Sequence, residues 1–430
     1  MTRSAGRLAD MTGLTPLADI TASRDLPAAY ARLRRQYGQV APVLLEKGRQ
    51  REINGWLLLG HREILDVVQD ERRFARDPNH WRDYAQGLVD PDSGLGPMMF
   101  PRDNAYFADG DTHRRLRAPL DEGLRELDQH AMQRRIRAIC TELTRGFVGR
   151  GHADLIAEYA SYIPMLTVAG TMFGIDLDHG RRLRDGLLAL FGSGTDSQDG
   201  YRDVQQILGE VLHARKAAPA GDLTTAFLHH PNLRNDTEVM QEMLLMISAG
   251  YETTAIWIAR TLLLMLGDPR FSGNIRGGTL GVNEALDEVL RLDPPMTHMP
   301  ARFPLADCQI DGRRIERGDA LILGLAAAGF DPRIHTGDWW QEIDNRSHLG
   351  FSAGSHTCPA KIPARLITRV AVETALHELP GVTLADPQAP VPLIPSPWTR
   401  HPAHLHVVFP AADRLRTAAV PPGPPATAVP

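Results

Sequence analysis

The sequence is poor in cysteine, in basic excess and in long apolar runs near its start. Its three cysteines (Cys140, Cys308 and Cys358) are widely spaced, and no CxxC pair occurs. This argues against a disulfide framework, a four-cysteine zinc site and a four-cysteine iron–sulfur cluster. The net charge of −5 argues against a protein that coats duplex nucleic acid. The first twenty residues contain no apolar segment of signal-peptide or membrane-anchor length, so we expect a soluble cytoplasmic protein.

The composition is that of an ordinary globular protein. Hydrophobic residues make up 43% and charged residues 23% of the 430 residues, which excludes disordered and collagen-like chains. The length alone allows about three domains, but no low-complexity linker divides the chain. The Pro-rich end, VPPGPPATAVP, predicts a disordered Ala/Pro-rich tail over 411–430.

Helical periodicity dominates the remaining sequence. The pattern predicts a hairpin over 40–59, a helix over 61–74, a long irregular loop over 77–111, nearly continuous helix over 112–267, β-hairpin material over 301–325 and a helix over 361–379. The apolar stretch 243–266 is long enough to span a bilayer. It contains Glu252 and Arg260, which a bilayer tolerates poorly, so we expect a helix through the centre of a large domain.

Cys358 is the residue with the most distinctive surroundings. It follows the small-residue loop Ser352–Ser355 and immediately precedes a predicted helix. Amide N–H groups at a helix start favour a thiolate, and a glycine such as Gly354 lets a flat ligand approach the backbone closely. These surroundings suit a nucleophile or an axial metal ligand, and a buried structural cysteine is the alternative.

The segment FSAGSHTCPA resembles the haem-binding loop of the cytochrome P450 family, FxxGxHxCxG. Phe351, Gly354, His356 and Cys358 match this motif, while Ala360 stands where the family usually has glycine. The resemblance implies that Cys358 is the proximal iron ligand of haem b (iron protoporphyrin IX). In that family the thiolate donates electrons that promote O–O cleavage.

Two further segments resemble the same family. In EALDEVLRLDPP, Glu288 and Arg291 lie on one helix face, as in the family's structural ExxR pair. Its usual third partner is an arginine shortly before the haem-binding loop, and Arg346 is the nearest candidate. AGYETT resembles the family's (A/G)Gx(D/E)T, where Ala249 and Gly250 flatten the helix against the porphyrin. This resemblance implies that Glu252 and Thr253 are the catalytic acid–alcohol pair, against the alternative that Thr253 merely bonds the carbonyl four residues back.

Cations are expected to converge on the two haem propionates. His113 and Arg117 match the family's HxxxR, Arg302 matches the arginine of RxAxxD, and His356 matches the remaining propionate partner. Each of them alone would be interpreted as surface charge.

The motifs run from about residue 110 to 365 and imply the cytochrome P450 fold, mainly α with small β-sheets, in a single large domain over 1–410. The implied function is a haem-thiolate monooxygenase that uses O₂ to hydroxylate or otherwise oxidise a sizeable organic substrate, such as a secondary metabolite. The chain has no flavin or iron–sulfur segment, so electrons are expected from a separate ferredoxin and ferredoxin reductase. Arg114, Arg115 and Lys361 are the expected docking charges.

Three alternatives remain. The first is oxidative C–C or C–O coupling or cyclisation without oxygen insertion. The second is a haem-binding protein without oxygenase activity, which would not need the Glu252–Thr253 pair. The third is a cysteine hydrolase using Cys358 and His356, for which no orienting Asn or Asp motif is visible.

By family analogy the substrate walls are expected within 79–100, 173–200, 245–249, 296–301 and 393–399. Their bulky side chains suggest a large, mostly apolar or aromatic natural product, with a small terpene as the alternative. These side chains are Trp81, Tyr84, Met98, Met99, Phe100, Phe173, Met296, Met299 and Trp398.

Overall fold

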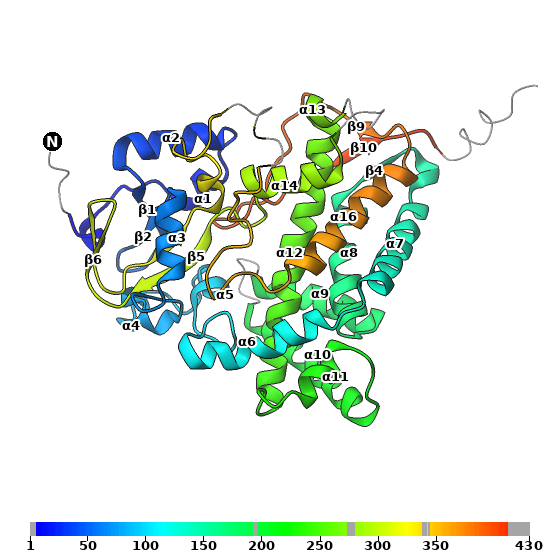
Figure 1. Ribbon diagram of the computed structural model, residues 1–430, viewed down its shortest axis with the longest axis horizontal. Coiled ribbons are helices and arrows are strands. Elements are labelled where there is room, and N and C mark those ends of the chain that lie inside the picture. The colour runs from blue at the N-terminus through cyan, green and yellow to red at the C-terminus, as the bar shows by residue number, and fades with distance from the viewer. Residues whose placement is uncertain (1–5, 192–196, 273–279, 338–341, 343–344, 412–430) are drawn as a thin grey trace, which may run out of the picture.

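The larger sheet and the N-terminal elements occupy one side of the molecule, and most helices occupy the other (Figure 1). This is a computed structural model, which describes residues 6–191, 197–272, 280–337, 342 and 345–411. The predicted class, mainly helical with small sheets, is confirmed. Apart from Ala411, the predicted tail over 411–430 lies outside the described residues.

The longer helices are α2 (Leu26–Tyr37), α3 (His61–Gln69), α6 (Gly110–Arg125), α7 (Gln129–Arg145), α9 (Leu177–Phe191), α10 (Ser197–Ala217), α11 (Leu223–His229), α12 (Asp236–Gly267), α14 (Val282–Leu292) and α16 (Lys361–Glu378). Shorter helices are α1 (Leu17–Thr21), α4 (Arg82–Ala85), α5 (Gly96–Met99), α8 (Tyr162–Pro164), α13 (Pro269–Ser272) and α15 (Leu325–Ala328). The 3-10 turns are η1 (Leu8–Asp10), η2 (Pro78–His80) and η3 (Val148–Arg150), and the π-helical segments are η4 (Ile156–Ala160) and η5 (Met165–Met172).

The main sheet has the strand order β1-β2-β8-β5-β3, in which only β2 and β8 are parallel. Its strands are β1 (Val40–Lys47), β2 (Glu52–Leu58), β3 (Phe74–Ala75), β5 (Met299–Pro304) and β8 (Leu321–Leu323). The smaller sheets pair β4 (His152–Asp154) and β9 (Thr383–Leu384) with β10 (His406–Val408), and β6 (Cys308–Ile310) with β7 (Arg313–Ile315). The predicted hairpin over 40–59 is therefore confirmed as β1–β2.

Helix α12 runs through the centre of the helical region and packs against α10, α14 and α16. Its N-terminus is capped by Asn235, whose side-chain oxygen accepts the N–H of Glu238 at 3.0 Å. The predicted central helix over 243–266 is thus confirmed. Among the helices of the described residues, none combines the length and apolar character that a membrane span needs.

Three sequence predictions need correction. The helix predicted over 61–74 ends at Gln69, because Asp70 accepts the N–H of Arg73 in a turn and Phe74 then joins β3 beside β5. The loop predicted as irregular over 77–111 contains η2, α4 and α5 and the start of α6. Only β6 and β7 form a separate hairpin within 301–325, since β5 and β8 belong to the main sheet.

Candidate functional site

The middle of α12 is accessible although most of this helix is buried. Ala249 is exposed and Gly250, Glu252 and Thr253 are half-buried, while the stretch from Thr254 to Leu262 is buried. Exposed side chains at the centre of a core helix indicate a ligand space against that face of the helix. The AGYETT motif therefore lies on the open stretch of α12.

The acid and the alcohol of this motif have different partners. The Thr253 hydroxyl donates to the carbonyl of Ala249 at 2.6 Å, the local bond that threonine often makes in helices. The Glu252 carboxylate accepts the hydroxyl of Thr399 at 3.2 Å. Burial raises the pKa of Glu252, and the bond from Thr399 opposes this shift. Thr399 was expected only as a substrate wall, and its contact with Glu252 has no sequence signal.

The Cys358 loop lies against the same helix. The Cys358 N–H donates to the carbonyl of Phe351 at 3.0 Å, and the Phe351 ring lies edge-on to Trp257 of α12 with centroids 5.6 Å apart. Burial raises the pKa of the Cys358 thiol, while the amide of Ala360 and the charge of Arg117 oppose this. The predicted effect of the helix-start amides has the right sign, but burial outweighs it.

Gly354 lies where the loop before α16 meets the end of α3. Its φ is +71°, and a Cβ atom there would lie 2.1 Å from the carbonyl oxygen of Val68 at the end of α3. A side chain is therefore excluded by both the backbone conformation and α3. In Figure 1 the segment leading into α16 crosses the near side of α12.

Buried basic side chains converge beside this loop. The rings of His113 and His356 stack with centroids 4.0 Å apart, and His356 Nε2 lies 3.9 Å from Asp109 Oδ1. Burial lowers the pKa of His356 to about 3 and that of Arg302 to about 10. Arg302 is 2% exposed, and its Nη2 has no hydrogen-bond partner among the described residues; the same holds for Nε2 of His113.

Arg76 belongs to the same cluster and was missed by the sequence analysis. Its side chain donates to the carbonyls of Tyr106 at 3.1 Å and Ala301 at 2.9 Å, and its backbone N–H donates to Asp109 at 2.8 Å. Burial, assisted by the charge of Arg302, lowers the pKa of Arg76 well below its usual range. No local pattern distinguishes Arg76 from other arginines in the sequence.

The unpaired donors fit a ligand that carries two carboxylates. Arg302, His113 and Arg76 each have a buried nitrogen without an acceptor, and Asp109 is the acid in contact with the cluster. A haem would supply its two propionates here and its iron to Cys358, so the residues present fit this group. Arg117 has other partners: it donates to the carbonyls of Ser355 at 3.3 Å and Thr357 at 2.7 Å. Arg117 therefore binds the Cys358 loop directly.

The Glu288–Arg291 pair forms a buried network. Arg291 binds Glu288 at 2.7 Å and Glu342 at 2.7 Å, and Arg270 binds the other oxygen of Glu288 at 3.0 Å. Arg346, the predicted third partner, lies instead 3.3 Å from Asp287, with 70% of its side chain exposed. The third partner of this pair, which the sequence left open, is therefore Arg270 from α13 rather than the candidate Arg346.

The predicted substrate walls divide into core and accessible residues. A side chain that lines an accessible site keeps part of its surface exposed. Trp81 is 1% exposed and packs on Phe303 with centroids 6.2 Å apart, and Phe173 is fully buried in the helical core. Met99 and Trp398 are also buried. The half-buried candidates are Tyr84, Met98, Phe100, Met296 and Met299.

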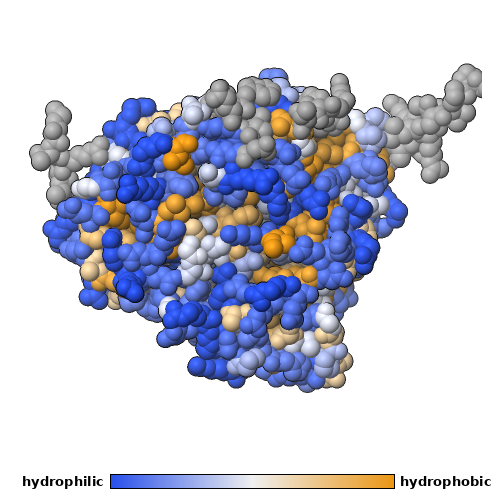
Figure 2. Space-filling view, in the orientation of Figure 1, coloured by the Kyte–Doolittle hydropathy of each residue, from blue (hydrophilic) through white to orange (hydrophobic). Residues whose placement is uncertain are grey.

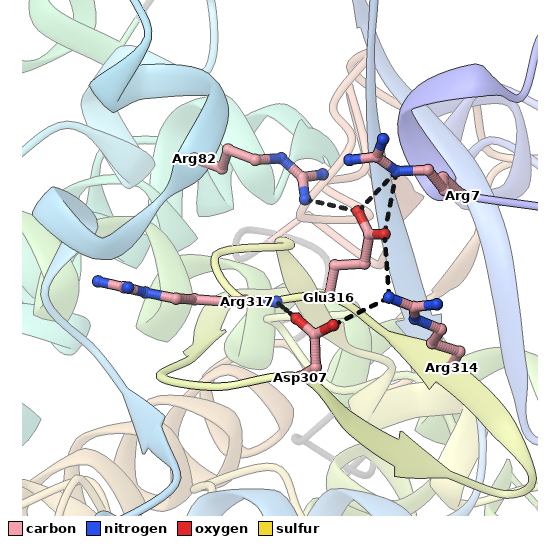
Figure 3. A pocket seen from close by; sticks show the side chains of 6 residues that line it. All are labelled: Arg7, Arg82, Asp307, Arg314, Glu316 and Arg317. Atoms are coloured by element: carbon pink, nitrogen blue, oxygen red, sulfur yellow. Dashed lines mark hydrogen bonds and ion pairs between the residues drawn. The ribbon is translucent and has the colours of Figure 1, made fainter.

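A separate cavity of about 460 Å³ lies beside the β6–β7 hairpin (Figure 3). Glu316 accepts from Arg7 and Arg82, each at 3.0 Å, and Asp307 binds Arg314 at 3.1 Å. Its charges are thus largely compensated within the protein. We interpret this cavity as part of a surface ion-pair network outside the candidate site.

Comparisons with known proteins point to one family. No protein-family model matches the chain. It is 24% identical over 371 residues to 2-hydroxy-5-methyl-1-naphthoate 7-hydroxylase of Streptomyces carzinostaticus, covering 83% of this chain and 88% of that protein. It is 25% identical over 404 residues to the cytochrome P450 monooxygenase PikC of Streptomyces venezuelae, covering 90% and 93%.

The solved structure of CYP154A1 from Streptomyces coelicolor matches with a TM-score of 0.80 and 25% identity, over 92% of this chain and 99% of that one. The relatives are thus bacterial P450 monooxygenases and hydroxylases, and the fold agrees over nearly the whole chain. The cytochrome P450 family uses a haem-thiolate cofactor, O₂ and separate redox partners. In sequence and fold the chain is similar to the bacterial cytochrome P450s, and it is a monooxygenase of this haem-thiolate type.

Proposed function

We propose that the chain binds haem b through Cys358 and oxidises a large secondary metabolite with electrons from a ferredoxin and its reductase. The observation that supports this most strongly is the convergence of three features. These are the Cys358 loop, the accessible stretch of α12 at Ala249–Thr253, and the unpaired donors of His113 and Arg302.

Each residue then has a defined task. When bound, the haem supplies oxygen activation, which thiolate ligation promotes. Arg302, His113 and His356 hold its propionates, while Phe351 and Gly354 shape the loop that carries Cys358. Ala249 presents a small, exposed side chain that leaves room for a flat ring beside α12, whereas a Cβ atom at Gly250 would contact Val168 at 3.4 Å. Burying two carboxylates against these donors removes the cost of their missing hydrogen bonds.

Thr253 and Glu252 manage protons in this proposal. The Thr253 hydroxyl exchanges its bond to the Ala249 carbonyl for one to a water or the reacting oxygen. Glu252 relays protons from solvent, and Thr399 orients its carboxylate through the bond at 3.2 Å. Because burial raises the pKa of Glu252, this group takes up a proton more readily than an exposed carboxylate does.

The experiment that tests the proposal uses the purified protein. Its reduced form under carbon monoxide should show the long-wavelength Soret band of thiolate-ligated haem, and one atom of ¹⁸O₂ should enter the product. A normal band with product that lacks the label would favour the alternative, oxidative coupling or cyclisation without oxygen insertion. A spectrum typical of histidine-ligated haem would contradict the proposal.

The substrate class follows from the relatives and the accessible walls. One relative is named for a naphthoate, so we propose a large, mostly apolar or aromatic metabolite. The half-buried Tyr84, Phe100 and Met296 provide apolar and aromatic contacts for such a molecule. Binding titrations against a natural-product library would identify it.

Replacing Thr253 with alanine should uncouple the enzyme. Haem incorporation and substrate binding should stay nearly intact, while product per NAD(P)H falls at least about tenfold and hydrogen peroxide rises. Glu252→Gln should slow the proton-dependent step and enlarge its solvent isotope effect. Thr253→Ser is the control, since it keeps the hydroxyl and should retain most coupling. Wild-type coupling in Thr253→Ala would restore the purely structural role of this threonine.

The redox partner should dock on the face that carries the start of α16. Hydrophobic residues gather in patches across the middle of this otherwise hydrophilic face (Figure 2). Lys361 is exposed and Ile362 is 63% exposed, whereas Arg115 is bound to Glu238 at 2.8 Å and is not free to dock. An acidic ferredoxin is the proposed partner.

Lys361→Glu should weaken ferredoxin binding about fivefold at low ionic strength, and the difference should shrink as salt is raised. Reduction rates measured against ferredoxin concentration check this. Arg181→Glu is the control, because Arg181 is an exposed arginine on α9 and not on α16. Equal binding by both variants, or turnover with NAD(P)H alone, would contradict the docking proposal.

A further inference from the structure

The segment 397–400 is held by hydrogen bonds at both of its ends. It carries Thr399, whose hydroxyl donates to the Glu252 carboxylate of α12 at 3.2 Å. The side chains of Trp398, Thr399 and Arg400 are all buried. A hydrogen bond depends on distance and direction, so the position of the Thr399 backbone decides whether this bond forms. The residues that fix the segment therefore act on Glu252 through Thr399.

His298 and its neighbour hold the start of the segment. The backbone N–H groups of Thr297 and His298 both donate to the carbonyl of Trp398, at 2.8 Å and 3.1 Å. The Nδ1 atom of the His298 ring lies 3.1 Å from the carbonyl oxygen of Pro397. His298 thus binds two successive carbonyls, with its backbone and with its side chain, immediately before Thr399.

The His298 ring is fully buried and has partners at both nitrogens. Nδ1 also lies 3.0 Å from the hydroxyl oxygen of Thr21, and Nε2 lies 2.8 Å from the hydroxyl oxygen of Tyr30. Because the carbonyl oxygen of Pro397 only accepts hydrogen bonds, Nδ1 carries the proton and Nε2 accepts the hydroxyl of Tyr30. Burial lowers the pKa of His298 to about 4, so the ring keeps this neutral form at neutral pH.

Arg260 of α12 holds the end of the segment. Its guanidinium donates to the carbonyl of Arg400 from Nε at 3.0 Å and from Nη2 at 2.5 Å. Both arginines bind Asp293, each at 3.0 Å. Arg260 lies eight residues after Glu252 on the same helix. Helix α12 therefore carries the acid and also fixes the segment that donates to it.

Thr399 is the hydrogen-bond donor of Glu252 among the described residues. Burial raises the pKa of Glu252, and the bond from Thr399 opposes this shift because it favours the charged carboxylate. The neighbouring titratable group is Tyr251, whose pKa burial raises, so it is uncharged at neutral pH. Displacing Thr399 would therefore remove the side-chain bond that favours the charged form of Glu252.

We infer that His298 is a positioning residue for the proton relay, because it holds Thr399 in hydrogen-bond contact with Glu252. It acts through the carbonyls of Pro397 and Trp398. This inference rests on the proposed function, since it takes Glu252 as the group that relays protons. A purely structural His298 would support the stability of the fold and leave the titration of Glu252 unchanged.

The test measures the protonation of Glu252 in the holoprotein. Infrared difference spectra against Glu252→Gln identify the C=O stretching band of the protonated carboxyl group, which is then followed against pH. Thr399→Val should move the midpoint of this titration to higher pH, because the lost bond favoured the charged form. His298→Leu should move the midpoint in the same direction. The double variant should move it no further than Thr399→Val alone, because both act on one bond.

Two milder variants keep the inference testable if His298→Leu does not fold. His298→Asn places an amide donor near the position of Nδ1 and should restore a midpoint close to that of the wild type. Thr21→Val removes a hydroxyl that lies 3.0 Å from the Pro397 carbonyl oxygen, so it should give a smaller shift. Thr144→Val is the matched control, because Thr144 is equally buried and bonds the Thr141 carbonyl within α7. Its midpoint should equal that of the wild type.

Product formed per NAD(P)H is the second measurement, and both His298→Leu and Thr399→Val should lower it about threefold. An unchanged midpoint in Thr399→Val, or in both His298→Leu and Thr21→Val, would overturn the inference. An equal shift in Thr144→Val would also overturn it, because the effect would then come from general destabilisation. The infrared titration needs no catalytic turnover, so failure of the proposed function is seen separately in the reduced carbon monoxide spectrum.

Discussion

Cys358→Ala should abolish the long-wavelength Soret band of the reduced carbon monoxide complex and reduce monooxygenase activity below detection. The thiolate is the proposed iron ligand, and no other cysteine lies in the loop before α16. The fold should survive, because the loop is closed by backbone bonds such as that from Cys358 N–H to the Phe351 carbonyl. Absorption spectra and circular dichroism of the purified variant check both statements.

Cys308→Ala is the matched control for this prediction. Cys308 is a half-buried free cysteine on β6, outside the candidate site. It should keep the wild-type spectrum and activity. Retention of the band in Cys358→Ala, or its loss in Cys308→Ala, would show that the ligand has been assigned to the wrong cysteine.

Arg291→Leu should be the most destabilising single substitution proposed here. Arg291 is 1% exposed and binds both Glu288 and Glu342, so its removal takes a cationic partner from each of two buried carboxylates. Breaking a buried ion pair from one side typically costs about 3–5 kcal/mol of the free energy of unfolding. Chemical denaturation should report this loss, and haem content should fall with it.

Arg346→Leu serves as the comparison. Its side chain is 70% exposed and contacts Asp287 at 3.3 Å, so we expect a change of at most about 0.5 kcal/mol. If Arg346→Leu were as damaging as Arg291→Leu, the assignment of Arg270 and Glu342 to the network would be wrong. If both variants were as stable as the wild type, the claim that this ion-pair network stabilises the fold would be wrong.

Much of the fold was predictable from local patterns. The periodicity over 243–266 predicted the core of α12, and the apolar runs around Lys47-Gly48 predicted β1 and β2. Helices and hairpins are recognisable because their contacts are close in sequence. Local patterns did not specify the pairing of β2 with β8, because these two strands are more than two hundred residues apart.

The sequence by itself identified the residues that we propose for the candidate site. The loop around Cys358, the Glu252–Thr253 pair and the basic residues His113 and Arg302 were all found from motifs within single segments. Such motifs can be recognised in a sequence because each one places particular residue types at a fixed spacing within a single segment.

Only the tertiary structure decided which residues complete those motifs. Arg270 and Glu342 reach the ExxR pair, Arg76 joins the cluster around Arg302, and Thr399 binds Glu252. Each contact joins distant segments, and its partner is chosen by how helices and strands pack rather than by local spacing. The glycine at 354 illustrates the same point, because the contact that excludes a side chain there comes from the end of α3.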